Sequence, residues 1–279
     1  MIVNGEECQQ VAISERGFNF GDGHFTTIKL AAGRALLLNL HIQRLQQACA
    51  VLAIEFADWQ ALTDMIQQQA ELLQQGVLKV TITRGSGGRG YSVQGCSAAN
   101  WYLQHRAIPA HYQQWADTGI VLTVCRYQQT VNPVLAGLKT LNRLDQVMLK
   151  QELDANNAVD GLVCSTEGYV IETSVANLFW VRDGEVYTPS TKRSGVEGIM
   201  KCHVLTLLKV LKICVHTGDY FVDQVFAADE VFITNAVMEL VPILAIVRSE
   251  DQAECRYTRQ NQTRSVCRQL QAKISAGDE

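Results

Sequence analysis

The sequence predicts an α+β protein built from two domains. The chain has 279 residues, which is enough for two domains of ordinary size. Strand-like and helix-like periods are mixed without a regular strand–helix–strand rhythm, which disfavours a doubly wound parallel sheet. The periodicity also lapses around residues 106–118. We therefore expect an N-terminal α/β domain over residues 1–108, a linker over residues 109–118 and a C-terminal α/β domain over residues 119–279.

The expected N-terminal domain begins with strands and continues with two helices. After a strand-like "MIVNG", the segment "HFTTIKLAAGRALLL" alternates well enough for two strands around a turn at Ala32-Gly33. Apolar residues then recur at helical spacing over residues 38–52. Asp58 can cap a second helix that ends at Gly76, a natural helix stop. "VLKVTITRG" and "NWYLQHRAI" are typical of strands on either side of a glycine-rich loop.

The expected C-terminal domain mixes both kinds of element. A strand "GIVLTVCRY" precedes a helix from about Leu141 to Asn156 and a strand "GLVCS". The segment "YVIETSVANLFWVRDGEVYTP" predicts a hairpin that turns at Asp183-Gly184. A helix "IMKCHVLTLLKVL", the strands "KICVHTG" and "DEVFITNAV", and a last helix complete the chain.

Composition and charge exclude several classes of function. The net charge of -4 leaves no basic stripe for phosphate backbones, so we expect small-molecule partners and no nucleic acid. Nine cysteines, without a C-x-x-C pair and without histidines at metal-ligand spacing, suit a reducing compartment and predict no metal site. The start lacks the pattern of a signal peptide, and the most apolar late stretch, "AVMELVPILAIV", contains Glu239 and is too short to span a bilayer. These features predict a cytoplasmic protein without a membrane partner.

The segment "GSGGRG" at residues 85–90 satisfies the G-x-G-x-x-G pattern of dinucleotide-binding loops. The residues after it do not read as a helix, so the helix N-terminus that would receive a pyrophosphate is missing. Two interpretations stay open. The segment is a flexible loop between hairpin strands, or it is a substrate-facing loop on which Arg84 and Arg89 bind carboxylates with their planar forks of donors.

Three charged residues stand out in otherwise apolar surroundings. Lys139 lies in "GLKTLNRLD" beside a helix start, Arg44 lies close to the apolar stripe of its helix, and Glu172 lies in a strand nearly free of charge. Each alone has an ordinary explanation as a surface or strand-edge residue. A buried carboxylate, however, must be paired or protonated, and "GVEGIMK" and "ITNAVM" place backbone N–H groups where an anion can bind. A lysine, an arginine, two backbone anion sites and a carboxylate are together what pyridoxal 5'-phosphate requires of a protein.

Seven segments, in order along the chain, resemble the landmarks of the fold-type IV pyridoxal-phosphate enzymes. They are "FNFGDGHFTTIKL", "HIQRLQQA", "VLKVTITRGSGGRGYS", "NPVLAGLKTLNRLDQV", "EGYVIETSVANLFW", "GVEGIMK" and "DEVFITNAVMELVPI". Within that group they are most similar to the bacterial 4-amino-4-deoxychorismate lyases, and the similarity weakens only after about residue 248. The resemblance implies a two-domain fold-type IV enzyme with the cofactor between the domains, and a homodimer.

The resemblance also implies roles for individual residues. Lys139 would form the Schiff base with the cofactor and remove a proton from the substrate, and Thr27 would be the proton donor. The remaining cofactor-binding residues would be Arg44 and the backbone amides of Ile199, Met200, Asn235 and Ala236 at the phosphate, and Glu172 at the pyridine nitrogen. Arg84 and Arg89 match loop positions suited to the substrate carboxylates.

The implied reaction is a lyase reaction of folate biosynthesis, in which 4-amino-4-deoxychorismate gives p-aminobenzoate and pyruvate. The alternative is a fold-type IV aminotransferase for branched-chain or D-amino acids, which would use the same lysine, glutamate and arginine. The branched-chain aminotransferases of this group carry a tyrosine five residues after the lysine, whereas this chain has Leu144 there. That departure agrees with the lyase pattern.

Overall fold

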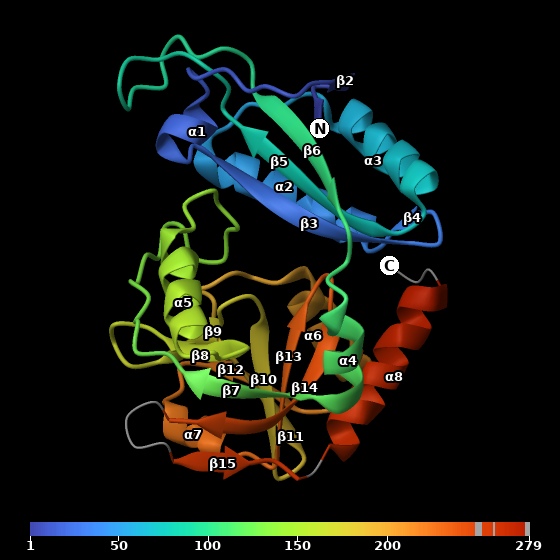
Figure 1. The fold of residues 1–279 in the computed structure, drawn as a ribbon, viewed down its shortest axis with the longest axis vertical. Coiled ribbons are helices and arrows are strands. Elements are labelled where there is room, and N and C mark those ends of the chain that lie inside the picture. Colours follow the sequence, from blue (N-terminus) through green and yellow to red (C-terminus); the bar gives the residue numbers. More distant parts are fainter. Residues whose placement is uncertain (249–252, 259, 277–279) are drawn as a thin grey trace. The chain divides into compact units, whose positions relative to one another are not determined.

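The computed structural model describes residues 1–248, 253–258 and 260–276 (Figure 1). Its contacts divide the chain into two units, which are described separately below. Within the described residues, the N-terminal unit comprises Met1–Pro109 together with Leu138–Asn142, and the C-terminal unit comprises Ala110–Gly137 and the described residues from Arg143 to residue 276. The mixed architecture confirms the α+β prediction. None of the described helices is both long and apolar enough to cross a membrane.

The N-terminal unit is built on an antiparallel sheet. Among the described residues this sheet has six strands in the order β2-β1-β6-β5-β3-β4. The strands are β1 (Ile2–Val3), β2 (Glu6–Glu7), β3 (Gly23–Ala31), β4 (Arg34–Ala35), β5 (Gly76–Thr83) and β6 (Asn100–Arg106). The helices are α1 (Arg16–Phe20), α2 (Leu38–Leu52) and α3 (Trp59–Leu73).

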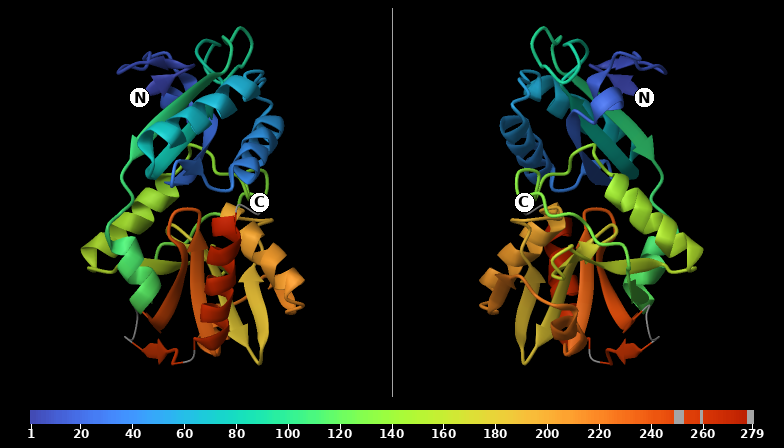
Figure 2. Two further views of the ribbon diagram at one scale, coloured as in Figure 1. Left: turned by 90° about the vertical axis from the view of Figure 1, so that its right-hand side faces the viewer. Right: turned by 90° about the vertical axis from the view of Figure 1, so that its left-hand side faces the viewer.

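Two helices, α2 and α3, cover one face of this sheet (Figure 2). Leu45 of α2 and Ile66 of α3 are fully buried against Ile28 of β3 and Val80 of β5. Because successive strand residues point to opposite faces, the residues of β3 that alternate with Ile28 lie on the other face. The alternation read in the sequence is therefore the alternation between a helix-covered face and an open face.

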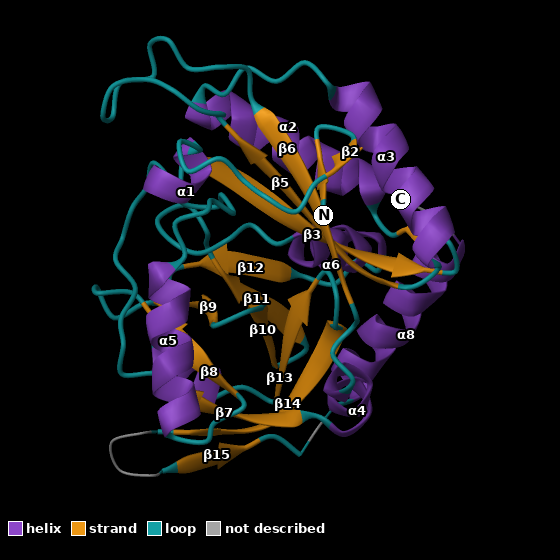
Figure 3. Ribbon diagram, turned by 45° about the horizontal axis from the view of Figure 1, so that its top comes forward, coloured by secondary structure: helices purple, strands orange, loops and turns teal. Residues whose placement is uncertain are grey.

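The C-terminal unit contains a larger mixed sheet (Figure 3). Its nine strands in the described part of the chain run in the order β12-β11-β10-β13-β14-β7-β8-β9, and β15 pairs with β14. The strands are β7 (Ile120–Val124), β8 (Asp160–Cys164), β9 (Val170–Thr173), β10 (Asn177–Arg182), β11 (Glu185–Pro189), β12 (Val215–Gly218), β13 (Glu230–Asn235), β14 (Glu239–Val247) and β15 (Glu254–Arg256). The helices are α4 (His111–Thr118), α5 (Leu144–Ala155), α6 (Ile199–Val210), α7 (Val222–Phe226) and α8 (Asn261–Ala276).

The predicted hairpin is confirmed, since β10 and β11 pair antiparallel with Arg182 opposite Glu185. Asp183 and Gly184 between them both have positive φ angles, 52° and 82°, as a tight hairpin turn requires.

Two segments differ from the sequence-based expectation. The residues expected to form an irregular linker include α4, whose aromatic residues Tyr112 and Trp115 contact each other with tilted rings and pack on the core of the C-terminal unit. These aromatic contacts favour a helix where the hydrophobic period alone gave no signal. The next helix begins at Leu144 and not at Leu141, because the chain before it pairs with β3.

Candidate active site

Strand β3 presents a short polar and aromatic series on the open face of the N-terminal sheet. Phe25 and Thr27 point to this face and are half-buried, whereas Thr26 and Ile28 point to the helices and have no exposed surface. Thr27 stands opposite Lys79 of β5 in the antiparallel register. The predicted proton donor is therefore on the sheet face that the helices leave open.

Lys139 belongs to a segment that adds to the edge of β3. The backbone N–H of Phe25 donates to the carbonyl of Lys139 at 2.9 Å, and the N–H of Leu141 donates to the carbonyl of Gly23 at 3.0 Å. Thr140, between them, forms a bridge with His24 and is buried. These backbone bonds explain why Leu138–Asn142 groups with the N-terminal unit, and they fix Lys139 beside Phe25.

Two ammonium groups lie close to the ring of Phe25. The distance from the ring centroid is 4.8 Å to Nζ of Lys139 and 4.6 Å to Nζ of Lys79, both within the range of cation–π attraction. Burial lowers the pKa of Lys79, and the nearby positive charge of Arg106 lowers it further. Sequence reasoning missed Lys79. Lys79 is a single charged residue early in a strand whose neighbours are mostly apolar. The same pattern drew attention to Glu172 in the sequence.

Arg44 lies on α2 one turn after His41. His41 is buried, and its Nδ1 is hydrogen-bonded to the hydroxyl of Thr26 at 2.6 Å. Burial lowers the pKa of His41 to about 3, with a smaller contribution from the charge of Arg44. His41 is therefore a neutral ring at physiological pH, and the positive charge at this end of α2 is that of Arg44.

Arg84 is held by groups of its own unit. Its Nε donates to Oδ2 of Asp22 at 2.9 Å, and its terminal nitrogens donate to the carbonyls of Leu52 and Ala53 at 2.7 Å each. Cations are favoured at the C-terminal end of a helix, where α2 presents these carbonyls. Three donors of the guanidinium are thus already engaged, while the assignment of Arg84 to a substrate carboxylate stays a prediction.

The glycine-rich loop is anchored by an arginine that the sequence analysis did not single out. Arg16 is only 3% exposed, and its guanidinium donates to Oδ2 of Asp22 at 2.8 Å and to the loop carbonyls of Gly87, Gly90 and Ser92 at 3.2 Å each. Burial alone would raise the pKa of Asp22, but the hydrogen bonds and charges of Arg84 and Arg16 lower it overall. Arg89 is exposed on this loop. Whether it binds substrate stays a prediction.

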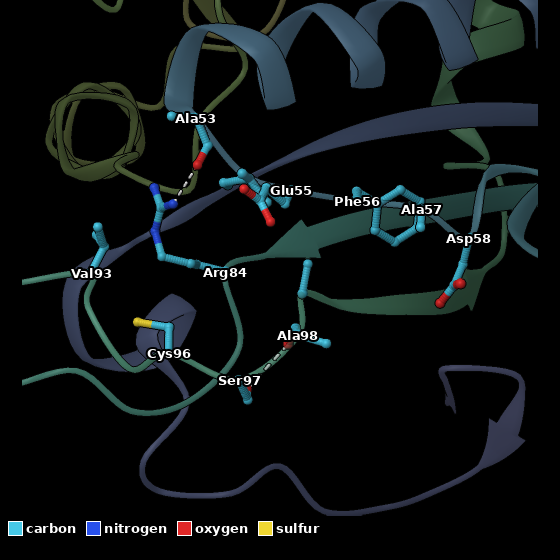
Figure 4. A pocket seen from close by; sticks show the side chains of 12 residues that line it. Ala53, Glu55, Phe56, Ala57, Asp58, Arg84, Val93, Cys96, Ser97 and Ala98 are labelled. Atoms are coloured by element: carbon cyan, nitrogen blue, oxygen red, sulfur yellow. Dashed lines mark hydrogen bonds between the residues drawn. The ribbon is translucent and has the colours of Figure 1, made fainter.

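A pocket of about 810 Å³ opens beside Arg84 (Figure 4). The carboxylates of Glu55 and Asp58 line it together with the end of the glycine-rich loop. Figure 4 shows the Arg84 side chain bound to the Ala53 carbonyl at its rim. Neither Thr27 nor Lys139 is among its lining residues, so this pocket is not the open face described above.

In the C-terminal unit, Glu172 is a buried carboxylate that hydrogen bonds keep in place. It lies on β9, is 6% exposed, and its Oε2 accepts hydrogen bonds from Nδ2 of Asn177 at 3.1 Å and from the N–H of Val196 at 3.2 Å. Arg143 lies close enough for the charge of Glu172 to raise its pKa, although burial is stronger and lowers the pKa overall. Glu172 is therefore paired in the way that a buried carboxylate requires.

The same asparagine connects Glu172 with the two predicted phosphate-binding segments. A Cβ atom at Gly198 would come within 1.8 Å of Oδ1 of Asn177, so only glycine fits at this N-cap of α6. Asn177 also stands opposite Thr234 in the register of β10 and β13, one residue before Asn235. The N-terminus of α6 and the end of β13 therefore both lie next to Asn177.

Backbone N–H groups are available at the first of these segments. Ile199 and Met200 are the first residues of α6, whose N-cap Gly198 has no side chain that could cap the helix, and the first N–H groups of a helix have no partner within it. At the second segment, Oδ1 of Asn235 accepts from the N–H groups of Val237 and Met238 at 2.9 Å and so shapes the turn that contains Ala236.

The donors described above fit pyridoxal 5'-phosphate. The C-terminal unit offers a helix N-terminus for the phosphate and a buried carboxylate for the protonated ring nitrogen, and the Gly198 N-cap keeps side-chain atoms away from the helix end. The N-terminal unit offers the Lys139 amine. The chain passes from one unit to the other between Gly137, which pairs with Val196, and Leu138, immediately before that lysine.

Comparison with known proteins identifies relatives over nearly the whole chain. Residues 23–246 match the model of the family "Amino-transferase class IV". An aminodeoxychorismate lyase of Vibrio harveyi is 34% identical over 90% of this chain and 93% of its own length. The crystal structure of 4-amino-4-deoxychorismate lyase from Pseudomonas aeruginosa superposes with a TM-score of 0.89 at 31% identity, covering 97% of this chain and 98% of that one. A hypothetical aminotransferase from Mycobacterium tuberculosis, in its PLP-bound form, shares the fold at 18% identity, with a TM-score of 0.85 and coverage of 99% and 98%.

Proposed function

The chain belongs to the class IV aminotransferase family, and from that membership we propose that it is a pyridoxal-phosphate-dependent lyase that converts 4-amino-4-deoxychorismate into p-aminobenzoate and pyruvate. The observation that carries this assignment is the 34% identity, over 90% of the chain, to a relative named aminodeoxychorismate lyase. A second lyase of that name has the same fold at 31% identity.

Pyridoxal 5'-phosphate, when bound, supplies an aromatic ring that accepts electrons from a carbon losing its proton. In the absence of substrate Lys139 would hold it covalently through the ε-amine, and Glu172 would hold it by accepting a hydrogen bond from its protonated ring nitrogen. The backbone amides of Ile199 and Met200, those at Asn235 and Ala236, and the Arg44 guanidinium would bind its phosphate. Each of these assignments follows the family resemblance, and the bonds of Glu172 to Asn177 and Val196 support the role of that carboxylate.

Two groups move protons in the proposed reaction. The Lys139 amine, which is free of the cofactor once the substrate amine has displaced it, takes the proton from C4 of the substrate ring, and the C–O bond to the enolpyruvyl group breaks. The Thr27 hydroxyl gives a proton to the departing group, which leaves as pyruvate, while the ring becomes aromatic as p-aminobenzoate. The proton that Lys139 takes replaces the one that Thr27 gives, so no other reactant is needed, and aromatisation makes the bond cleavage favourable. The position of Lys139 beside Phe25, two residues before Thr27 on β3, supports this division of roles.

The substrate carries carboxylates, and cations of the N-terminal unit are suited to bind them. Arg84 and Arg89 are the residues that the resemblance assigns. Lys79 is a further candidate, because its ammonium lies on the same open face as Thr27 and stands opposite that residue in the sheet. Carboxylate binding would favour the charged form of Lys79 and oppose the effect of burial on its pKa.

The decisive experiment supplies the purified holoenzyme with 4-amino-4-deoxychorismate made from chorismate by a separate synthase, and follows p-aminobenzoate and pyruvate together. We expect equal amounts of the two products, which Lys139→Ala abolishes and the exposed-lysine control Lys150→Ala preserves. Products in the absence of the protein, or near-normal turnover by Lys139→Ala, would contradict the scheme. If neither product forms while an amino acid alone converts the cofactor from its aldehyde to its amine form, the enzyme is an aminotransferase.

We also propose that the protein is a cytoplasmic homodimer, because its scattered cysteines suit a reducing compartment and the family resemblance implies the dimer. Light scattering on the holoenzyme should give about twice the mass of one chain. A mass of one chain at micromolar concentration would contradict the dimer.

A further inference from the structure

Three side chains of different chemistry meet at one edge of the C-terminal sheet. They are Glu185, the first residue of β11, Cys214, which directly precedes β12, and His216 within β12. One ligand atom of each lies within 4.8 Å of those of the other two. Nε2 of His216 lies 2.8 Å from Oε2 of Glu185 and 3.4 Å from Sγ of Cys214.

The parallel pairing of β11 and β12 creates this cluster. Val186 stands opposite Val215 and Tyr187 opposite His216, and the N–H of Val186 donates to the carbonyl of Cys214 at 3.0 Å. Cys214 and His216 are two residues apart, so they share one side of the chain. The ring of Tyr187 stacks on that of His216, with centroids 4.7 Å apart and an interplanar angle of 24°. The imidazole orientation is therefore supported by packing as well as by the Glu185 carboxylate.

Solvent has access to all three side chains, which lie on or next to β12, a strand at one edge of the described sheet (Figure 3). The side chains of Glu185 and His216 are 45% and 42% exposed, and Cys214 is an exposed free thiol. A dissolved ion can reach them without any movement of the backbone.

We propose that Glu185, Cys214 and His216 bind a zinc ion, with water completing a tetrahedron. Thiolate, imidazole and carboxylate are the three donor types that zinc accepts, and zinc tolerates their mixture in one site. Magnesium and calcium prefer oxygen donors alone, so the thiol and imidazole disfavour them. The site lies in the C-terminal unit and is independent of the proposed lyase reaction.

Two of the three separations between the ligand atoms are close to those around such an ion, and the third is at most 4.8 Å. Zinc lies about 2.3 Å from sulfur and about 2.1 Å from nitrogen or oxygen, so tetrahedral angles put sulfur and nitrogen about 3.6 Å apart and nitrogen and oxygen about 3.4 Å apart. The sulfur–nitrogen distance of 3.4 Å already fits. The hydrogen bond of 2.8 Å between His216 and Glu185 must open by about 0.6 Å when the metal replaces its proton.

Bound zinc would join β11 to β12 across the sheet edge. A ligand that binds the folded state and not the unfolded chain stabilises the fold in proportion to the logarithm of its concentration over its Kd. The sequence predicted no metal site, because it has no C-x-x-C pair and no histidine was recognised at metal-ligand spacing. The third ligand, Glu185, comes near the other two only through the pairing of β11 with β12.

The test adds cobalt(II), a spectroscopic substitute for zinc, to the reduced holoenzyme. We expect one equivalent to produce a thiolate-to-cobalt absorption band that zinc abolishes. Cys214→Ser should remove the band, and both Cys214→Ser and His216→Gln should weaken zinc binding by at least about 100-fold, more than the loss of an outer-shell partner usually does. Zinc should also raise the melting temperature of the wild-type holoenzyme.

Matched controls separate this site from other thiols and histidines. Cys8→Ser removes a partly exposed thiol of the N-terminal unit, and His105→Gln removes an exposed histidine; both should retain the band and the zinc affinity. The proposal is overturned if the wild-type protein shows no thiolate–cobalt band, or if Cys214→Ser keeps it. Lyase turnover of each variant in the absence of metal reports separately on the proposed function.

Discussion

Thr26 and Thr27 are neighbours on β3 with opposite surroundings. The hydroxyl of Thr26 is bonded to Nδ1 of His41 at 2.6 Å between the sheet and the helices, with no exposed surface. Thr27 is half-buried on the other face, opposite Lys79 and two residues after Phe25. The same residue type therefore serves the fold at one position and is available to a substrate at the next, because the strand period of two separates them.

The two faces of this sheet also differ in the charge of their side chains. On the helix-covered face, burial lowers the pKa of His24 to about 4, and burial with the charge of Arg44 lowers that of His41 to about 3. Both rings are neutral at pH 7. On the open face, two lysine side chains surround Phe25. The covered face excludes charge, and the open face gathers it where a carboxylate substrate would need it.

The contrast between the two threonines is tested most strongly by the substitution Thr27→Val. If the Thr27 hydroxyl donates the proton, its loss should lower kcat by about 100-fold to 10,000-fold, the usual contribution of a general acid. The free energy of unfolding should change by less than about 0.5 kcal/mol, because the hydroxyl faces away from the core. Steady-state formation of p-aminobenzoate and urea titration measure the two quantities. Thr27→Ser, which restores a hydroxyl, should recover much of the rate, and near-normal turnover by Thr27→Val would remove the residue from the mechanism.

The neutral histidines of the covered face predict a dependence of stability on pH. Their folded pKa values, about 4 for His24 and about 3 for His41, lie below the value of about 6.5 for unfolded histidine. The unfolded chain therefore binds more protons below pH 6.5, so stability is full above that pH and falls as the pH decreases. From pH 7 to pH 5 each histidine should lower the free energy of unfolding by about 2 kcal/mol.

Urea titrations at pH 7 and pH 5 measure this loss. His41→Gln should remove about half of the loss that the two histidines cause, whereas the exposed-residue control His105→Gln should leave it unchanged. If the free energy of unfolding stays constant or increases when the pH is lowered from 7 to 5, the covered face does not exclude protons from these rings.

The contrast between the two faces also shows what the sequence could predict. The alternation in "HFTTIKL" predicts a strand with one covered face, and β3 has that pattern. The apolar neighbours of Glu172 left two interpretations open, an ordinary strand-edge residue or a buried and paired carboxylate, and the structure shows it buried and hydrogen-bonded. Such features depend on residues near in sequence, where periodicity carries information.

Contacts between residues that are far apart in the chain left no comparable pattern in the sequence. "LKTLNRLDQV" has a helical period, yet Leu138–Asn142 pairs with β3 because backbone groups at the edge of a strand accept any extended segment. The fork of donors on Arg84 suggested substrate carboxylates, whereas Asp22 and the end of α2 engage three of those donors. Neither partner is near its counterpart in the sequence, so no local pattern identifies them.

The smallest expected effect belongs to Thr26→Val, which keeps the shape of the side chain and removes its hydroxyl. Nδ1 of His41 would lose its partner while remaining buried, and an unsatisfied buried polar group costs about 1–3 kcal/mol. The free energy of unfolding in urea should fall by that amount, while kcat of the holoenzyme stays within about twofold of the wild-type value since the hydroxyl faces the helices. Thr27→Val, one residue away, is the matched control with the opposite expectation. If Thr26→Val instead slowed turnover and left stability unchanged, the covered face would take part in chemistry, and the division of roles between the two threonines would be wrong.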